Sequence, residues 1–249
     1  MLTRLRVLLV IIGAVAQIVL GGLPFILNWE NTIASRSNSS ISSVIPSSYA
    51  FSIWNILFLG SLIFAIIHAL PKYHQDSLFS KVGWLAALAF FGNALWEIYV
   101  PLYGFTVISL LIISVMILSP LLVIMDFLKK EQDSRWFFIP LVMLCGWVSV
   151  ATFVNISVMA LFLGFNPFML TETTQAIIVI LSAGLITIFF AYYFNEVFYN
   201  ICVLWGFVGI YMANAEQSTS IAFLALALGI AGFLIAVIVR SKQFNWPTS

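Results

Sequence analysis

Charged residues are scarce in this chain of 249 residues. They make up 8% of the sequence, and hydrophobic residues make up 63%. Soluble domains have about 25% charged and about 45–50% apolar residues. A water-soluble fold of this length could not bury so much apolar surface, because small domains keep a large exposed area. The composition therefore excludes an ordinary soluble domain and indicates a protein that lies in a lipid bilayer.

Basic clusters and cysteine motifs are also lacking. The ten Lys and Arg residues are scattered and the net charge is +1, so the chain cannot form the basic face that nucleic-acid binding requires. Cys145 and Cys202 each lie in an apolar run and form no CxxC motif. They predict two buried, inert thiols and neither a disulfide framework nor a metal site.

The sequence contains none of the common catalytic motifs. It has no G-x-S-x-G elbow, no H-E-x-x-H, no P-loop and no dinucleotide fingerprint. His68 and His74 have no carboxylate cluster near them and make a poor metal site. We therefore expect no catalytic residues, and an enzyme acting on a bound ligand is the least favoured reading.

Long apolar runs are what the sequence has instead. A helix needs about 20 mostly apolar residues to cross a bilayer, and eight runs meet this requirement. They are Leu5–Leu27, Tyr49–Leu70, Lys81–Val100, Gly104–Leu128, Trp136–Leu163, Thr174–Tyr193, Val197–Ala213 and Ser220–Val239. The sequence therefore predicts an all-α fold, a polytopic transmembrane bundle of eight helices in direct contact with lipid.

The basic residues test this count independently, because Lys and Arg collect on the cytoplasmic side of short loops. If the N-terminus is cytoplasmic, Arg36 is the only basic residue that falls outside. The basic residues that then fall inside are Arg4, Arg6, Lys72, Lys81, Lys129, Lys130, Arg135, Arg240 and Lys242. This bias requires an even number of spans and predicts that both termini are cytoplasmic.

Polar side chains within or next to the predicted spans are candidates for function, because their burial in lipid is costly. They are Asn93, Glu97, Asn155, Asn195, Glu196 and Asn200. An isolated Asn can instead form a hydrogen bond to a neighbouring helix that only supports packing. The last three residues could form a proton or ion relay in a small secondary transporter, and a solvated turn explains them equally well.

Aromatic residues are concentrated on particular helix faces. Phe51 and Trp54 are three residues apart and share one face of the second predicted helix. Trp147, Ala151 and Asn155 form one stripe on the fifth predicted helix, with a small residue in its middle. Such a stripe suits a flat, mostly apolar ligand, because rings stack on Trp and the amide fixes orientation. Ordinary aromatic packing between helices explains the stripe equally well.

Three segments resemble the tryptophan-rich sensory protein family, the bacterial relatives of the mitochondrial translocator protein. Trp147–Asn155 is similar to the family pattern W-x-x-x-A-T-x-x-N, and Asn93–Trp96 is similar to N-x-x-W. Pro46–Gly60 resembles the start of the second family helix, although a Ser-rich segment replaces the preceding family loop. The resemblance covers residues 1–165 as a five-helix core, whereas residues 166–249 add three helices as an extended branch.

The resemblance implies a bacterial membrane protein that binds a tetrapyrrole, haem or protoporphyrin, and often forms homodimers. Its implied pocket has aromatic walls, clearance at a small residue and Asn side chains that donate or accept hydrogen bonds. With Phe51 from the aromatic face, the residues expected to bind the ligand are Phe51, Trp54, Asn93, Trp96, Trp147, Ala151 and Asn155. We therefore expect a sensory or binding protein with an intramembrane site for a hydrophobic small molecule, with the transporter as the alternative.

Overall fold

The computed structural model describes residues 2–38, 42–129 and 135–243, and this part of the chain is helical without any strand. Eight helical segments are long and apolar enough to cross a membrane, as predicted from the sequence. They are Leu2–Ile26, Ser48–His68, Ser77–Tyr103, Val107–Lys129, Trp136–Phe162, Glu172–Phe194, Val197–Asn214 and Thr219–Lys242. The eight-helix prediction is therefore confirmed, and Lys130 lies outside the described residues.

Several of these spans consist of more than one helical element. The α-helices are α1 (Leu2–Ile26), α2 (Ile33–Asn38), α3 (Ile53–His68), α4 (Ser77–Tyr103), α5 (Val107–Leu111), α6 (Ser119–Lys129), α7 (Ile139–Phe162), α8 (Glu172–Phe194), α9 (Val197–Asn214) and α10 (Thr219–Gln243). The 3-10 helices are η1 (Ser48–Ser52), η2 (Pro71–Tyr73) and η4 (Arg135–Phe138), and η3 (Ile112–Leu118) is a π-helix.

The helix ends follow from local hydrogen bonding. The Asp76 side chain accepts from the backbone N–H of Phe79 and so caps the start of α4. The hydroxyl of Thr171 accepts from the backbone N–H of Thr174 and so caps the start of α8. Asn195 ends α8 in the left-handed conformation, with φ of 54°, which Asn adopts more readily than most residues. These caps separate long apolar runs into individual spans.

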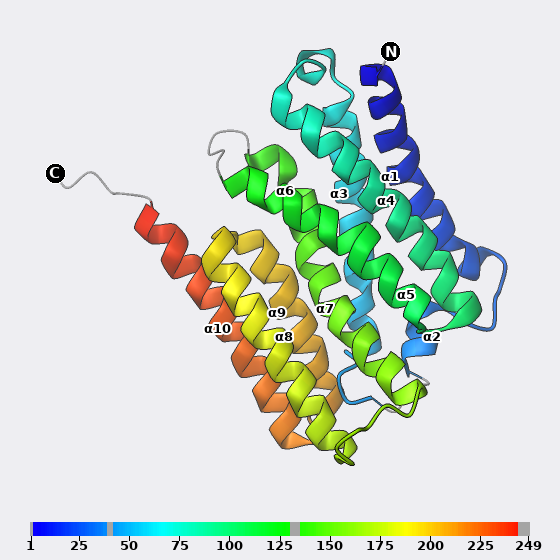
Figure 1. Cartoon of the computed structure of the whole chain (residues 1–249), viewed down its shortest axis with the longest axis vertical. Coiled ribbons are helices and arrows are strands. Elements are labelled where there is room, and N and C mark those ends of the chain that lie inside the picture. The colour runs from blue at the N-terminus through cyan, green and yellow to red at the C-terminus, as the bar shows by residue number, and fades with distance from the viewer. Residues whose placement is uncertain (1, 39–41, 130–134, 244–249) are drawn as a thin grey trace.

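The helices form two groups joined by α7. Figure 1 shows α8, α9 and α10 together on one side and α1, α3 and α4 on the other. α1 packs mainly on α4, α10 packs on α9 and α8, and α7 contacts both α3 and α9. The largest buried side chains include Trp147 of α7 and Tyr199 of α9. α7 is therefore the central helix of the bundle.

Two glycines permit close helix contacts in the C-terminal part. A Cβ atom at Gly146 of α7 would overlap the carbonyl oxygen of Tyr199 of α9. A Cβ atom at Gly229 of α10 would lie 2.8 Å from the Cβ atom of Phe207 of α9. Small residues let helix backbones approach closely where no hydrophobic drive exists between helices. The three C-terminal helices are thus joined to the rest of the bundle through α9.

One end of the bundle carries most of the basic residues that the structure describes. The start of α1 and the end of α10 lie towards this end (Figure 1). Arg6 of α1 is buried there and donates to the Ser80 hydroxyl and to the carbonyl oxygen of His74. Lys81 lies over the ring of Phe127, which joins the start of α4 to the end of α6. The opposite end carries Arg36 on α2.

Candidate ligand-binding site

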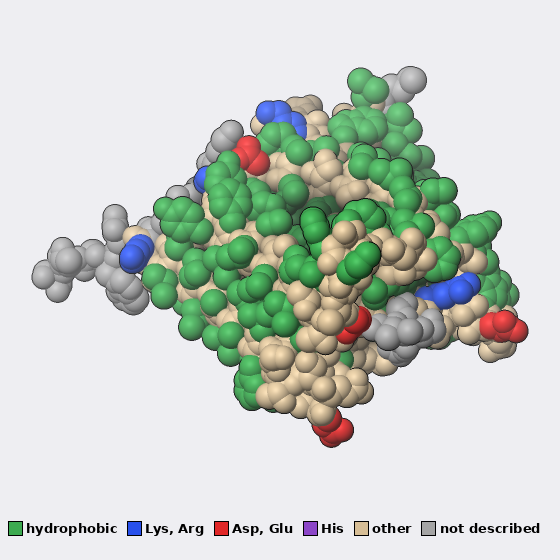
Figure 2. All heavy atoms as spheres, turned by 60° about the horizontal axis from the view of Figure 1, so that its bottom comes forward, with side chains coloured by type: hydrophobic (Ala, Val, Ile, Leu, Met, Phe, Trp, Pro, Cys, Tyr) green, Lys and Arg blue, Asp and Glu red, His purple; other side chains and the backbone are tan. Residues whose placement is uncertain are grey.

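A cavity of about 460 Å³ lies between α1, α2, η1, α3 and α4. This volume is within the range of about 300–1,000 Å³ that is common for small-molecule sites. Figure 2 looks onto this end of the bundle, where the surface is hollowed among hydrophobic side chains. The lining residues are Ile18, Gly21, Gly22, Pro24, Phe25, Thr32, Ile33, Ala34, Ser48, Phe51, Ser52, Trp54, Asn55, Phe58, Glu97 and Pro101.

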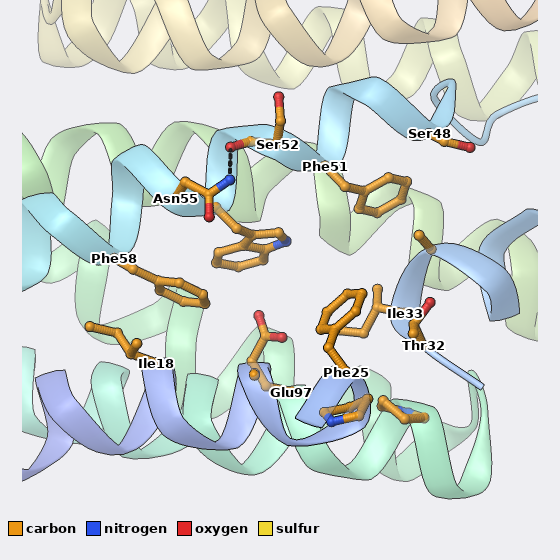
Figure 3. Close-up of a pocket in the computed structure, with 16 residues that line it drawn as sticks. Ile18, Phe25, Thr32, Ile33, Ser48, Phe51, Ser52, Asn55, Phe58 and Glu97 are labelled. Carbon is orange, nitrogen blue, oxygen red and sulfur yellow. Dashed lines mark hydrogen bonds between the residues drawn. The ribbon is translucent and has the colours of Figure 1, made fainter. Parts of the chain in front are cut away.

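The sequence places aromatic side chains along one wall of this cavity. η1 passes into α3 without a break, so Phe51, Trp54 and Phe58 project from one continuous helical segment. The rings of Trp54 and Phe58 are stacked, with centroids 5.4 Å apart. Figure 3 shows Phe58 and Ile18 at one side of the cavity and Ser48 and Thr32 at the other. The cavity therefore has an apolar side and a polar side.

The predicted tryptophans form one cluster behind this wall. The ring centroid of Trp54 lies 6.4 Å from that of Trp96 and 6.2 Å from that of Trp147. Phe51 meets Trp147 edge to face at 6.2 Å. The indole nitrogens of all three tryptophans are buried and have no hydrogen-bond acceptor among the described residues. Four of the residues proposed from the sequence are thus brought together.

Ala151 lies beside a much smaller gap. This gap has a volume of about 20 Å³, and Phe51, Trp96, Trp147 and Ala151 are among the residues that line it. A gap of this size has room for about one water molecule and no ring. Ala151 therefore lies against the back of the tryptophan cluster, and Ile33 and Phe51 line both spaces.

The two predicted asparagines lie in contacts between helices. The Asn93 amide of α4 donates to Oε1 of Gln17 of α1 at 3.0 Å. Oδ1 of Asn155 accepts from the Ser109 hydroxyl of α5 at 3.2 Å. Both asparagines are fully buried, and neither is among the residues that line the two spaces described above. These bonds are the packing role that isolated asparagines often have in membrane helices.

Glu97 is the acidic residue of the large cavity. It follows Trp96 on α4 and is 4% exposed. Its Oε1 atom has no hydrogen-bond partner among the residues that the structure describes. Its Oε2 atom packs against α1, because a Cβ atom at Gly21 would lie 3.2 Å from it. From the sequence alone Glu97 was a candidate polar group, but its place in a ligand-sized cavity was not foreseen.

Helices α8 and α9 hold η1 and the segment that leads into it. The Ser43 backbone N–H and hydroxyl donate to the two carboxylate oxygens of Glu172, at 2.8 and 3.0 Å. The Asn214 amide donates to the carbonyl oxygen of Ser43, and the Trp205 indole donates to that of Ala50, both at 2.9 Å. Sequence analysis missed these residues, because a side chain that bonds a distant loop has no local pattern. We call this set of bonds the α8–α9 clamp.

A second cavity of about 190 Å³ lies at the opposite end of the bundle. Its lining includes Trp136, Glu196 and Arg240. Asn195, by contrast, ends α8, and the Asn200 amide donates to the carbonyl oxygen of Glu196 at 3.0 Å. Of the three residues considered for a relay, Glu196 alone lines this cavity.

Comparison with known families agrees with the membrane-spanning helical fold. The model of the TSPO-like protein family matches residues 6–239, which includes the three C-terminal helices. The searches of curated proteins and of solved structures gave no match to the chain. Within the described residues, no group of three or more His, Cys, Asp and Glu side chains could hold a metal ion.

Proposed function

Because this chain belongs to the TSPO-like protein family, we propose that it is a membrane protein that binds a flat hydrophobic molecule in the cavity between α1, α2, α3 and α4. One observation carries this proposal. A ligand-sized cavity of about 460 Å³ is bordered by aromatic rings and reaches the apolar part of the bundle. Pockets of this size with apolar walls and few polar groups are the usual form of small-molecule sites.

The walls favour a flat ligand. The stacked rings of Trp54 and Phe58 form one face, and Phe25 of α1 lies across the cavity from them (Figure 3). A planar ring system between such side chains gains stacking contacts as well as burial of apolar area. The family resemblance names a tetrapyrrole, haem or protoporphyrin, as the first candidate. Its polar edge would lie towards Ser48 and Thr32.

The residues predicted from the sequence take different roles in this proposal. Phe51 and Trp54 contact the ligand directly, because both line the cavity. Trp96, Trp147 and Ala151 support that wall from behind and act on the ligand through the position of the Trp54 ring. Asn93 and Asn155 would contribute to folding, by fixing α4 against α1 and α7 against α5.

The charge distribution supports one orientation in the membrane. Basic residues are concentrated at the end that holds the start of α1 and the end of α10. Short loops rich in Lys and Arg face the cytoplasm in bacterial cell membranes. The ligand cavity, near α2 and η1, would then open towards the outside. Reporter fusions at the two ends should show the C-terminus inside and the α1–α3 connection outside. An external C-terminus would reverse the orientation.

The proposal is tested by titration of the detergent-purified protein with haem and protoporphyrin, followed by tryptophan fluorescence. Gly22→Leu should fill the cavity and weaken binding, because a Cβ atom at Gly22 meets only the Ile26 side chain, at 3.8 Å. Val15→Leu on the same helix is the matched control, since Val15 is exposed and lies outside the cavity. Equal affinities for both variants and the wild type would contradict binding in this cavity.

A small secondary transporter is the second candidate. The observation in its favour is the second cavity, where Glu196 and Arg240 lie at the other end of the bundle from the first cavity. Ionisable residues deep in a membrane bundle often mark ion or substrate pathways. Uptake of a labelled ligand into proteoliposomes, with Glu196→Gln as the comparison, separates transport from binding. Binding without uptake would leave the sensory or receptor function.

A further inference from the structure

The large cavity has a single ionisable residue in its wall. Among the described residues that line it, every side chain other than Glu97 is apolar, or bears a hydroxyl or amide group. Glu97 lies on α4, and Figure 3 shows its carboxyl group projecting into the space between α1 and α3. The rings of Phe58 and Phe25 lie to either side of it in the same view. A ligand that occupies the space between α1 and α3 therefore lies beside a carboxyl group.

The protein itself leaves this carboxyl group unsatisfied. The side chain is 4% exposed, and Oε1 has no hydrogen-bond partner among the described residues. A buried carboxyl oxygen without a partner costs free energy, whether the group is charged or neutral. A ligand group that donates a hydrogen bond, and above all a cation, removes this cost. The unpaired oxygen thus indicates a ligand that carries a hydrogen-bond donor or a positive charge.

The neighbouring basic residue does not fill this role in the cavity wall. Arg36 of α2 is not among the lining residues, and it donates to the carbonyl oxygens of Pro101 and Leu102 at the end of α4. The closest polar side chain of α3 in the wall, Asn55, donates to the carbonyl oxygen of Ser52 at 3.2 Å. The one ionisable group among the described lining residues is therefore an acid, which favours a cationic group and disfavours an anionic group beside Glu97.

Resting on the proposed function, we propose that the cavity selects flat apolar molecules that carry a protonated amine. The ammonium group would donate to the carboxyl group of Glu97, while the rings lie against Trp54 and Phe58. A hydrogen bond between two charged groups is shorter and stronger than one between neutral groups. Because Glu97 is only 4% exposed, this bond is also less screened by water and salt. This contact adds selection by charge to binding by shape.

Three probes with the same three fused rings test this selection. They are aminomethylanthracene as the cation, methylanthracene as the neutral compound and anthracene carboxylate as the anion. Each is titrated into the detergent-purified wild type, Glu97→Gln and Glu216→Gln, with tryptophan fluorescence as the readout. Glu216→Gln removes one negative charge from the exposed α9–α10 turn, far from the cavity lining, and so serves as the control.

The wild type and Glu216→Gln should prefer the cation to the neutral probe by roughly 10- to 100-fold, as expected for one bond to a charged group. Glu97→Gln should lose this preference, keep its affinity for the neutral probe and bind the anion more tightly than the wild type does. This gain cannot come from misfolding. A preference for the cation that survives in Glu97→Gln would overturn the selection by Glu97. Binding of all three probes with equal affinity would overturn it too, whereas failure of every probe to bind would instead reject the cavity as a ligand site.

Discussion

The indole rings of Trp54 and Trp147 meet edge to face, with centroids 6.2 Å apart and ring planes at 88°. This contact links α3, which forms the wall of the large cavity, to α7, the central helix of the bundle. On the α7 side, Trp147 and Ala151 border the gap of about 20 Å³. We therefore expect that a larger side chain in the gap shifts the Trp147 ring, and through it the Trp54 ring in the cavity wall.

Ala151→Phe tests this link. A benzyl side chain does not fit in the gap, so it should overpack the cluster, cost about 1–3 kcal/mol of stability and weaken ligand binding by displacing Trp147. Ala151→Ser is the size-matched control and should leave both properties nearly unchanged. Thermal unfolding and ligand titration on the same samples separate the effects. A stable Ala151→Phe protein that has lost binding would place the ligand in the gap itself.

The hydrogen bond between Asn93 and Gln17 should contribute to folding and not to ligand affinity. It joins α4 to α1 at 3.0 Å, and neither residue lines a cavity described above. A double-mutant cycle with Asn93→Ala and Gln17→Ala should give a coupling energy of about 0.6 kcal/mol, the average for such bonds in a membrane protein. A loss of affinity in Asn93→Ala at unchanged stability would show that Asn93 reaches the ligand.

Gly146→Ala should disrupt the junction between α7 and α9. The added methyl group would overlap the carbonyl oxygen of Tyr199, which as backbone cannot turn away. We expect a loss of at least about 1–3 kcal/mol of stability, as for other overpacked cores. Gly22→Ala is the control, since its methyl group has free space and Ala favours helices by up to about 1 kcal/mol over Gly. Equal melting temperatures for the two variants would contradict the close α7–α9 contact.

The α8–α9 clamp should set the position of the segment before η1. Glu172→Ala and Asn214→Ala each remove bonds to Ser43, so amide hydrogens of residues 42–50 should exchange faster and ligand affinity should fall. Gln217→Ala, an exposed change in the turn after α9, should alter neither. Unchanged exchange in both clamp variants would show that the segment is held by its other contacts.

The fold could be predicted from composition, whereas the cavity could not. Runs of apolar residues fix the number of spans, because each must be about as long as the bilayer is thick. The family resemblance also led us to expect Trp54, Trp96 and Trp147 in one place, and their rings lie close together. However, the same reasoning could not tell a cavity from a packed contact. Asn155 shares a helix face with Trp147, yet it bonds Ser109, because a face does not reveal which helix covers it.

The features missed by sequence analysis depend on contacts between distant segments. Glu97 looked like one of several polar residues, and only the approach of α1, with Gly21 beside the carboxylate, shows that it borders a cavity. Likewise, Glu172 is the first residue of α8. Its bonds to Ser43 arise because α8 begins next to a loop about 130 residues earlier, a placement that local sequence patterns do not encode.

The most direct test of the central claim, that the cavity holds a flat hydrophobic ligand, is protection of a cysteine placed in its wall. Cys145 and Cys202 are buried, so they give little background labelling. Asn55→Cys puts an exposed thiol in the wall, and Glu216→Cys puts a reference thiol at the same end of the bundle, outside the cavity. Saturating protoporphyrin or aminomethylanthracene should slow maleimide labelling of Asn55→Cys and leave the rate for Glu216→Cys unchanged. Equal labelling rates of Asn55→Cys with and without both compounds would contradict the account.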